Sequence, residues 1–327
     1  MPADRSDFAR GTLLALISTL FLSTTGIFIR YLTNTYAIPA LVLAFWRDLF
    51  VVATLLPILA LVRPRLLHPP QGTRGFLALY GLVLALFNAL WTLSVALNGA
   101  AVATMLVYSS AAFTALLGRW WLRERLHRGK VIAVVLGIGG CALVSRTIDP
   151  WTGALAMPGS AMGIATGMLS GLSYALYSLM GRSAARRGLH PWTSVFYAFT
   201  FAAAILLALD LQPLLALPGR AARPADLFWL GDAWRGWGVL FALAAVPTVA
   251  GFGLYTMSLS LLPSSVANLI LTLEPPLTAV TAYFLLGERL SGGQIAGGFA
   301  IITGVIVLQV YEGHLAALVA PLNNARR

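Results

Sequence analysis

The sequence has few charged residues and almost no cysteine for a chain of its length. Only 10% of its 327 residues are charged, whereas a typical soluble domain has about 25%. Because a soluble protein of this size needs much more polar surface to cover its core, the shortage excludes an ordinary soluble enzyme. The single cysteine, Cys141, excludes a disulfide framework and a cluster of thiolate metal ligands.

The sequence also lacks the motifs of catalysis and cofactor binding. Its four histidines lie far apart, and no two of them have the spacing of metal ligands. The glycine-rich segments follow no predicted strand and contain no Gly-Lys-Ser/Thr, so they are not phosphate loops. We therefore expect no metal, no cofactor and no enzymatic activity. No ATPase domain is recognisable, so any work the protein does must draw on gradients.

Long apolar segments occupy most of the chain, and 59% of its residues are hydrophobic. A transmembrane helix needs about 20 mostly apolar residues, and these segments are too long for barrel strands. We predict an all-α integral membrane protein with ten transmembrane helices. The expected spans are 11–30, 38–61, 75–97, 101–121, 131–147, 161–180, 191–211, 236–257, 265–285 and 294–311.

The basic residues are distributed unequally between the two sides of the predicted membrane. The net charge is +11, but the charges fall between the apolar segments and form no nucleic-acid footprint. Ten spans place both termini on one side, which collects 15 Arg and Lys residues against six on the other. Because cytoplasmic loops carry the excess of positive charge, both termini are predicted to be cytoplasmic.

The two halves of the chain repeat each other. A shift of 164 residues aligns 90–126 with 254–290 at 12 identities in 37 positions, and a shift of 152 aligns Pro39 with Pro191. We predict two five-helix units, 1–148 and 149–327. Because five is odd, the second unit must enter the membrane inverted. Inverted repeats are typical of alternating-access transporters, whose binding site lies near the midplane where the repeats meet.

Several motifs in these units resemble those of the EamA-type units of the drug/metabolite transporter superfamily. The resemblance rests on Arg-Glu-Arg-Leu at 123–126, Gly-Glu-Arg-Leu at 287–290, Leu-Glu-Pro-Pro at 273–276 and Arg47. It covers nearly the whole chain, from 11 to 311. It implies a ten-helix exporter or permease of small metabolites in a bacterial inner membrane. The first copy departs from the pattern at 110–111, where Ser-Ala replaces Glu-Pro, so a symmetric pair of carboxylates is not expected.

Glu274 is the leading candidate for a functional site. It is expected about 15 Å into its span, near the middle of a hydrocarbon core about 30 Å thick. A carboxyl group at that depth must be protonated, paired or hydrated. One interpretation is a site for a substrate ammonium group or a proton. The alternative is a neutral, hydrogen-bonded glutamic acid that packs a helix junction, with Arg47 as a candidate partner.

Three prolines inside predicted spans are candidate hinges. Pro275 and Pro276 free the carbonyls four residues earlier, those of Leu271 and Thr272. Such exposed backbone is tolerated at membrane depth only beside protein or a water-filled cavity. Pro247 has the same effect in the span before. A static kink that only packs is the structural alternative.

Arg47 and Asp48 are expected about 12 Å inside the second span. Neighbours on a helix point about 100° apart, so each is expected to find its own partner. Arg47 could clamp a substrate carboxylate or form part of a gate together with Asp48. A structural ion pair between helices is the alternative.

Polar and aromatic side chains near the middle of other spans are candidates to line a substrate cavity. Tyrosine carries a polar tip that needs a partner when buried, and simple packing is the alternative for each residue. These candidates are Asn88, Trp91, Tyr108, Tyr174, Tyr177 and Tyr255.

The sequence thus predicts a secondary transporter that exports small metabolites, amino acids or related amphipathic solutes above all, by alternating access around a central cavity. The alternative is a proton-coupled multidrug or broad-substrate efflux permease. Its expected partners are a small-molecule substrate and the lipid bilayer, with protons as a candidate coupling ion and no nucleic acid. Monomer and homodimer both remain open.

Overall fold

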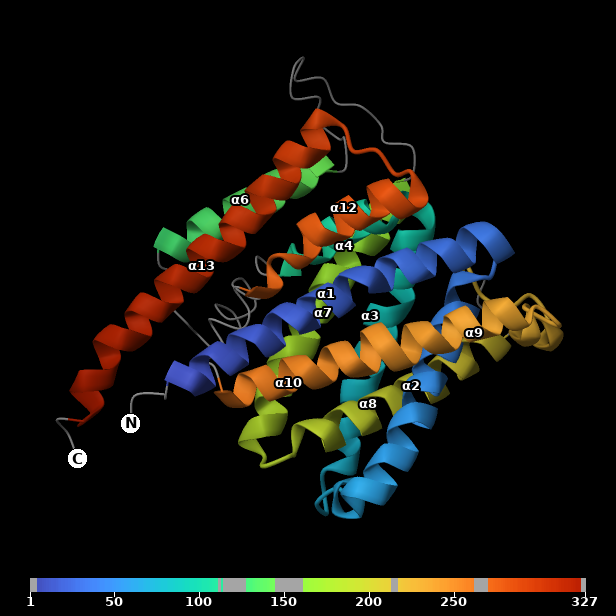
Figure 1. Cartoon of the computed structure of the whole chain (residues 1–327), viewed down its shortest axis with the longest axis horizontal. Coiled ribbons are helices and arrows are strands. Elements are labelled where there is room, and N and C mark those ends of the chain that lie inside the picture. The colour runs from blue at the N-terminus through green and yellow to red at the C-terminus, as the bar shows by residue number, and fades with distance from the viewer. Residues whose placement is uncertain are drawn as a thin grey trace.

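The computed structural model describes residues 5–110, 113, 128–144, 161–212, 217–261 and 270–324, and within these ranges every regular element is helical. Most of the helices pack side by side in one bundle (Figure 1). Helix α1 begins on the same side of the molecule as the one where α13 ends. That arrangement is the one expected of a chain that crosses a membrane an even number of times.

The helices of the first half cover the first five predicted spans in whole or in part. They are α1 (Arg5–Tyr36), α2 (Ala40–Val62), α3 (Arg74–Asn98), α4 (Ala100–Val107) and α6 (Arg128–Val144), with the short 3-10 helix η1 (Pro64–Leu67) after α2.

The helices of the second half cover the other five predicted spans in the same way. They are α7 (Ala161–Arg186), α8 (Pro191–Leu211), α9 (Trp234–Leu243), α10 (Gly251–Leu261), α12 (Glu274–Leu286) and α13 (Gly292–Asn324), with the 3-10 helix η2 (Pro224–Phe228) and the π-helical turn η3 (Ala244–Ala250).

Five helical segments within the described ranges are long and apolar enough to cross a membrane. They are Phe8–Tyr36, Ala40–Val62, Arg74–Asn98, Pro191–Leu211 and Trp234–Tyr255. The segments Val134–Val144 and Gly292–Val307 are shorter apolar helices. The last of the five long segments runs through α9, η3 and α10, which together form the eighth predicted span. Parts of the predicted spans 101–121, 131–147 and 265–285 lie outside the described residues.

Helices of one half pack mainly against helices of the other half, and the packed pairs are related by the repeat. Helix α1 packs on α10 as α7 packs on α3, and α1 packs on α12 as α7 packs on α4. The equivalent helices α2 and α8, α4 and α12, and α6 and α13 pack directly on each other. The core is therefore formed largely between the two units.

The relative directions of the packed helices show that the second unit is inverted. Helices α4 and α12 are antiparallel, since the start of one meets the end of the other through Ala100 and Glu288. Helices α1 and α12 are parallel, since Thr278 donates to the Ser23 carbonyl at 3.0 Å and Arg30 lies 3.6 Å from Glu288 further along both. In a chain that crosses the membrane ten times, the ninth span, which contains α12, runs parallel to the first and antiparallel to the fourth.

Glycine allows the closest helix contacts. A Cβ at Gly140 of α6 would lie 2.7 Å from the Gly297 carbonyl of α13, so these two backbones touch. In α7, Gly163 faces Asn98 of α3, and Gly171 faces Ser109 just beyond α4. The glycines repeated every four residues in α7 therefore serve packing within the chain.

The long connection between α8 and α9 is held to the helix ends by hydrogen bonds. The Leu41 amide donates to the Gly219 carbonyl at 2.8 Å, and Trp46 Nε1 donates to the Leu227 carbonyl at 2.6 Å. Trp229 Nε1 donates to the carbonyl of Tyr36 at 2.9 Å. The described part of this connection, from residue 217 onward, thus lies against the ends of α1 and α2.

Candidate substrate site

Two equivalent helices are interrupted at equivalent positions. Helix α4 is followed by a turn at 108–109, and α12 is preceded by a turn at 272–273. In each turn the second residue donates its backbone N–H to the carbonyl three residues earlier, at 3.1 Å in both cases. The shift of 164 residues relates one turn to the other. Interrupted helices in corresponding positions of two inverted halves are the usual location of a transporter's binding site.

The two interruptions meet through Tyr108. Its hydroxyl lies 2.7 Å from the Leu271 carbonyl oxygen and 3.0 Å from Glu274 Oε2. The Leu271 carbonyl is one of the two that the proline spacing frees, because Pro275 has no N–H to offer it. A tyrosine from the first repeat therefore satisfies a backbone acceptor and a carboxyl group of the second.

The number of hydrogens in this contact bears on the state of Glu274. Tyr108 has one hydroxyl hydrogen, whereas the Leu271 carbonyl and an ionised carboxylate can only accept. Both distances are those of hydrogen bonds, and both bonds can form at once if Tyr108 donates to Leu271 while a protonated Glu274 donates to Tyr108. The geometry is thus fully satisfied when Glu274 carries a proton.

Two details of the sequence interpretation of Glu274 need correction. Glu274 is the first residue of α12, rather than a residue in the middle of an unbroken helix. Pro275 and Pro276 then occupy the first turn of α12, directly after the turn at 272–273, so they lie where the ninth span is interrupted. The partner of Glu274 is Tyr108, whereas Arg47 pairs elsewhere.

Tyrosines of α7 and α10 surround the contact between Tyr108 and Glu274. Glu274 and Tyr255 each lie within electrostatic range of both Tyr108 and Tyr174. The Tyr174 ring lies 6.3 Å from that of Tyr177. The structure therefore brings together all four tyrosines that the sequence singles out.

A second polar cluster joins α2 to α3. Asp48 is completely buried and accepts two hydrogen bonds from Asn88 Nδ2, at 2.9 and 2.8 Å. Arg47 Nε lies 3.3 Å from Asp48 Oδ1. Asp48 thus has a partner of its own in Asn88, as expected, whereas Arg47 pairs with its neighbour Asp48, against the expectation. The long arginine side chain folds back along the helix and overcomes the angle between the two Cβ directions.

Trp91 completes this second cluster. The guanidinium carbon of Arg47 lies 5.8 Å from the Trp91 ring centroid, in cation–π range. Phe87, which the sequence interpretation missed, lies between the clusters, with its ring 6.2 Å from Trp91 and 5.2 Å from Tyr174. The only feature of the sequence that could have pointed to Phe87 is its position one helical turn before Trp91. Aromatic rings thus connect the second cluster to the tyrosines around Glu274.

Pro247 lies in the π-helical turn η3 between α9 and α10, which packs on α1 and α2. The carbonyl it frees is that of Leu243, which accepts a hydrogen bond from Thr248 Oγ1 at 2.9 Å. Ser18 of α1 donates to the Gly251 carbonyl at 2.7 Å just after this turn. Pro247 therefore marks an irregular turn that side-chain hydrogen bonds support. π-Helical turns inside α-helices are frequent at functional sites.

The Gly-Glu-Arg-Leu motif has a structural role. Glu288 accepts hydrogen bonds from the Ala100 and Ala101 amides at 2.9 and 3.2 Å, so it caps the start of α4. Arg30 lies 3.6 Å from Glu288 and donates to the Ala96 carbonyl at the end of α3. Opposite charges thus complement the dipoles of two helix ends. The equivalent motif at 123–126 lies outside the described residues.

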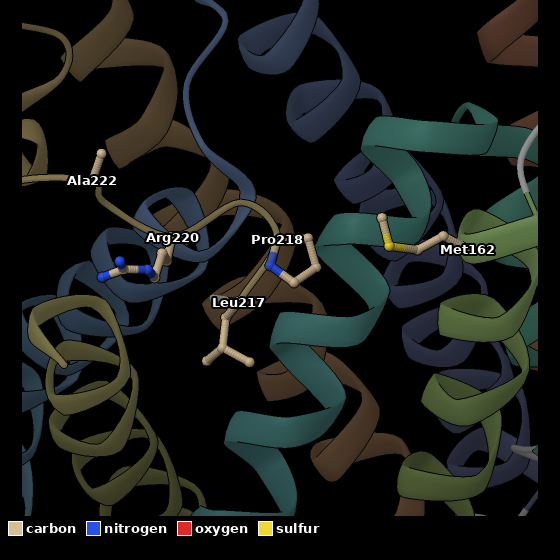
Figure 2. A pocket seen from close by; sticks show the side chains of 5 residues that line it. All are labelled: Met162, Leu217, Pro218, Arg220 and Ala222. Carbon is tan, nitrogen blue, oxygen red and sulfur yellow. The ribbon is translucent and has the colours of Figure 1, made fainter. Parts of the chain in front are cut away.

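A pocket of about 490 Å³ lies where the connection after α8 meets the start of α7 (Figure 2). The residues that line it were not predicted as site residues: Met162, Leu217, Pro218, Arg220 and Ala222. Gly163, next to Met162, packs on Asn98 at the end of α3. Trp91 is seven residues, or about 10 Å, earlier in α3. The pocket is therefore near the end of α3 that lies beyond the second cluster.

Inverted halves, interrupted helices and a polar centre between them define a multi-span membrane transporter. The EamA-like transporter family matches residues 9–146 and again 161–310, so the chain belongs to that family.

Several named proteins are similar to this chain. The uncharacterized transporter YwfM of Bacillus subtilis is 26% identical over 298 residues, which cover 91% of this chain and 93% of that protein. An uncharacterized transporter of Archaeoglobus fulgidus is 28% identical over 68% of this chain and 74% of its own length. The threonine/homoserine exporter RhtA of Salmonella typhimurium is 26% identical, over 75% of this chain and 74% of RhtA. A solved crystal structure covers 93% of this chain and 98% of its own, with a TM-score of 0.57 and 16% identity, which supports the fold alone.

Proposed function

We propose that this protein is a secondary transporter that exports small metabolites, above all amino acids or related amphipathic solutes, across the bacterial inner membrane. The cycle rocks two inverted units, 1–148 and 149–327, about a central cavity. Both termini are cytoplasmic in this proposal. The threonine/homoserine export in the name of RhtA supports the amino acid class.

The contact between Tyr108 and Glu274 is the observation that carries the proposal. It joins the two units where both are interrupted, so a rocking motion about the centre would open it. Glu274 also has favourable surroundings in both of its charge states. When protonated it can donate to Tyr108, and when ionised it lies at the N-terminus of α12, where the helix dipole stabilises negative charge. A residue that exchanges a proton or binds a substrate ammonium group needs such surroundings.

The pocket beside Arg220 fits the same scheme. It lies toward the end of α3 that is outside the cell if the termini are cytoplasmic. A solute released from the centre past Trp91 would leave through this region.

A proton-coupled multidrug or broad-substrate permease is the second candidate. The aromatic series that includes Trp91, Phe87, Tyr174, Tyr177 and Tyr80 favours it. Ring faces contact apolar solutes of many shapes, so such a lining discriminates weakly among them.

Metabolite profiling tests the proposal. Medium and cytosol are compared for cells that express the wild type, Glu274→Gln or an empty vector at matched membrane levels of protein. Asp232→Asn, a change of the same kind at an exposed loop position, is the control. We expect one class of amino acid to accumulate outside only with the wild type and the control. Equal export by Glu274→Gln would remove Glu274 from the site, and no export by the wild type would overturn the transporter's proposed direction and substrate class.

A further inference from the structure

Trp91 holds a buried hydrogen-bond donor that has no partner. Its side chain is only 7% exposed, and Nε1 bonds to no acceptor in the part of the chain that the structure describes. Buried donors without partners are rare in folded proteins because each loses its bond to water without replacement. Tryptophan can only donate from this nitrogen, so the missing partner must be an acceptor.

Arg47, a charged residue in contact with Trp91, also has donors to spare. Arg47 lies over the Trp91 ring, and its Nε and Nη2 atoms are each 3.3 Å from Asp48 Oδ1. Guanidinium carries five N–H donors, and within the described ranges no acceptor is bonded to Nη1. The guanidinium of Arg47, with its spare N–H group, and the indole of Trp91, with its unpaired N–H, therefore lie within cation–π distance of each other. A carboxylate has two oxygens and is the group that best satisfies both.

The charge of the cluster limits what else the ligand can carry. Asp48 already balances Arg47, so a simple anion would add an unbalanced negative charge to a buried site, which is strongly unfavourable. A zwitterion adds no net charge. Its ammonium group could contact the faces of Tyr174 and Tyr177, with Glu274 near Tyr174.

We propose that Arg47 and Trp91 bind the carboxylate of a zwitterionic amino acid, whose ammonium group faces the tyrosines and Glu274. This inference rests on the proposed function and specifies the substrate class of its central site. It also assigns Trp91 a role through one atom, Nε1, rather than through its ring.

The substitution Trp91→Phe isolates that atom. It keeps an aromatic ring beneath Arg47 and replaces the indole, whose N–H bonds to no described residue, by a phenyl ring without a donor. Trp46→Phe is the matched control, because Trp46 Nε1 donates to the Leu227 carbonyl in the loop contact. Binding to the purified full-length protein is measured by calorimetry for L-phenylalanine and L-leucine, for their amides and for 3-phenylpropionate. Thermal unfolding of each variant is recorded in the same detergent.

We expect Trp91→Phe to weaken binding of both amino acids about tenfold, as befits the loss of one hydrogen bond to a charged group. Binding of the amides should weaken clearly less than that of the acids, because a neutral carbonyl oxygen is the weaker acceptor. 3-Phenylpropionate should bind the wild type at least tenfold more weakly than L-phenylalanine. Trp46→Phe should change none of these affinities. Both variants lose a ring of the indole, so a fall in thermal stability by itself says nothing about the N–H group.

Equal weakening of acids and amides by Trp91→Phe would overturn the carboxylate assignment, and so would unchanged affinity for the acids. Binding of neither amino acid to the wild type would overturn it as well. Because these measurements report binding alone, they are independent of direction. Cells that export no solute, together with a purified protein that discriminates acid from amide, would refute the exporter proposal and leave the carboxylate site standing.

Discussion

The Tyr108 hydroxyl and the Glu274 carboxyl group lie 3.0 Å apart although 166 residues separate them in the chain. Each belongs to the interruption of its own repeat, and the shift that relates the repeats also relates the two turns. The contact is therefore made across the interface between two inverted units. Its environment differs on the two sides, because only the second repeat supplies a carboxyl group and two prolines at this point.

Removing the Tyr108 hydroxyl should impair transport more than stability. Tyr108→Phe leaves the Leu271 carbonyl and Glu274 without their shared partner, and we expect export to fall at least tenfold. Tyr197→Phe is the control, since its hydroxyl donates to the Leu67 carbonyl at 2.7 Å outside the centre. Both variants should lose about 1 kcal/mol of unfolding free energy, but Tyr197→Phe should retain export. Equal export by the two variants would show that the Tyr108 contact only packs the helices.

The contact between α6 and α13 should tolerate no side chain at Gly140. A Cβ there would lie 2.6 Å from Ile301 Cγ1 and 2.7 Å from the Gly297 carbonyl oxygen, whereas a Cβ at Gly139 would meet nothing within 4 Å. Gly140→Ala should therefore lower the unfolding free energy by about 1–3 kcal/mol. Gly139→Ala should leave it unchanged or raise it by up to about 1 kcal/mol. Unfolding by titration with denaturing detergent compares the two, and equal stability would contradict this contact.

Glu288 should contribute more to stability than a carboxylate in a loop. It accepts two backbone N–H bonds at the start of α4 and lies near Arg30. Glu288→Gln should cost about 1.5–3 kcal/mol, the range for hydrogen bonds to charged groups. Asp226 accepts the Arg223 amide at 2.9 Å in an exposed loop, so Asp226→Asn should cost less than about 1 kcal/mol. The same detergent titration measures both, and a reversed order would refute the capping role.

Asp48 should stabilise the folded protein chiefly because it balances the charge of the buried Arg47. Asp48→Asn leaves a positive charge at a site that is 2% exposed, and we expect a loss of about 3–5 kcal/mol. The double variant Arg47→Gln with Asp48→Asn removes both charges and should recover at least half of that loss. A double-mutant cycle on unfolding free energies checks the coupling. Additive effects would mean that the two side chains do not interact in the folded protein.

Topology reporters test the predicted orientation. A reporter that is active only in the cytoplasm should work when fused after residue 327 and fail when inserted after Asp232. A reporter that needs the outer compartment should show the reverse. The excess of basic residues in loops on one predicted side, 15 against six, is the physical reason for this expectation. The opposite pattern would invert the proposed direction of the pocket beside Arg220.

Much of this architecture could be predicted because its causes are local or periodic. Apolar length predicts the helices, since lipid offers the backbone no hydrogen bonds. The repeat predicts the inversion, since an odd number of helices must reverse the second copy. The chemistry of Pro275 predicts the free carbonyl of Leu271, because the missing N–H lies within the same segment.

The partners of the polar side chains could not be predicted in the same way. That Tyr108 reaches Leu271 and that Asn88 reaches Asp48 depends on which helices pack together and in which direction. The pairing of Arg47 with Asp48 depends on a side chain bending toward its neighbour in a buried site, which Cβ directions alone do not reveal.

The sequence by itself determined that this protein lies in a membrane, that it is helical and that its second half repeats the first. These properties follow from composition, from the length of the apolar segments and from the period of the repeat. Only the tertiary structure decided that the Pro-Pro pair starts a helix, that the two interruptions touch, and that Trp91 presents an unsatisfied donor beside Arg47. Those facts arise from contacts between residues far apart in the chain, and a buried polar group acquires its meaning only from what surrounds it.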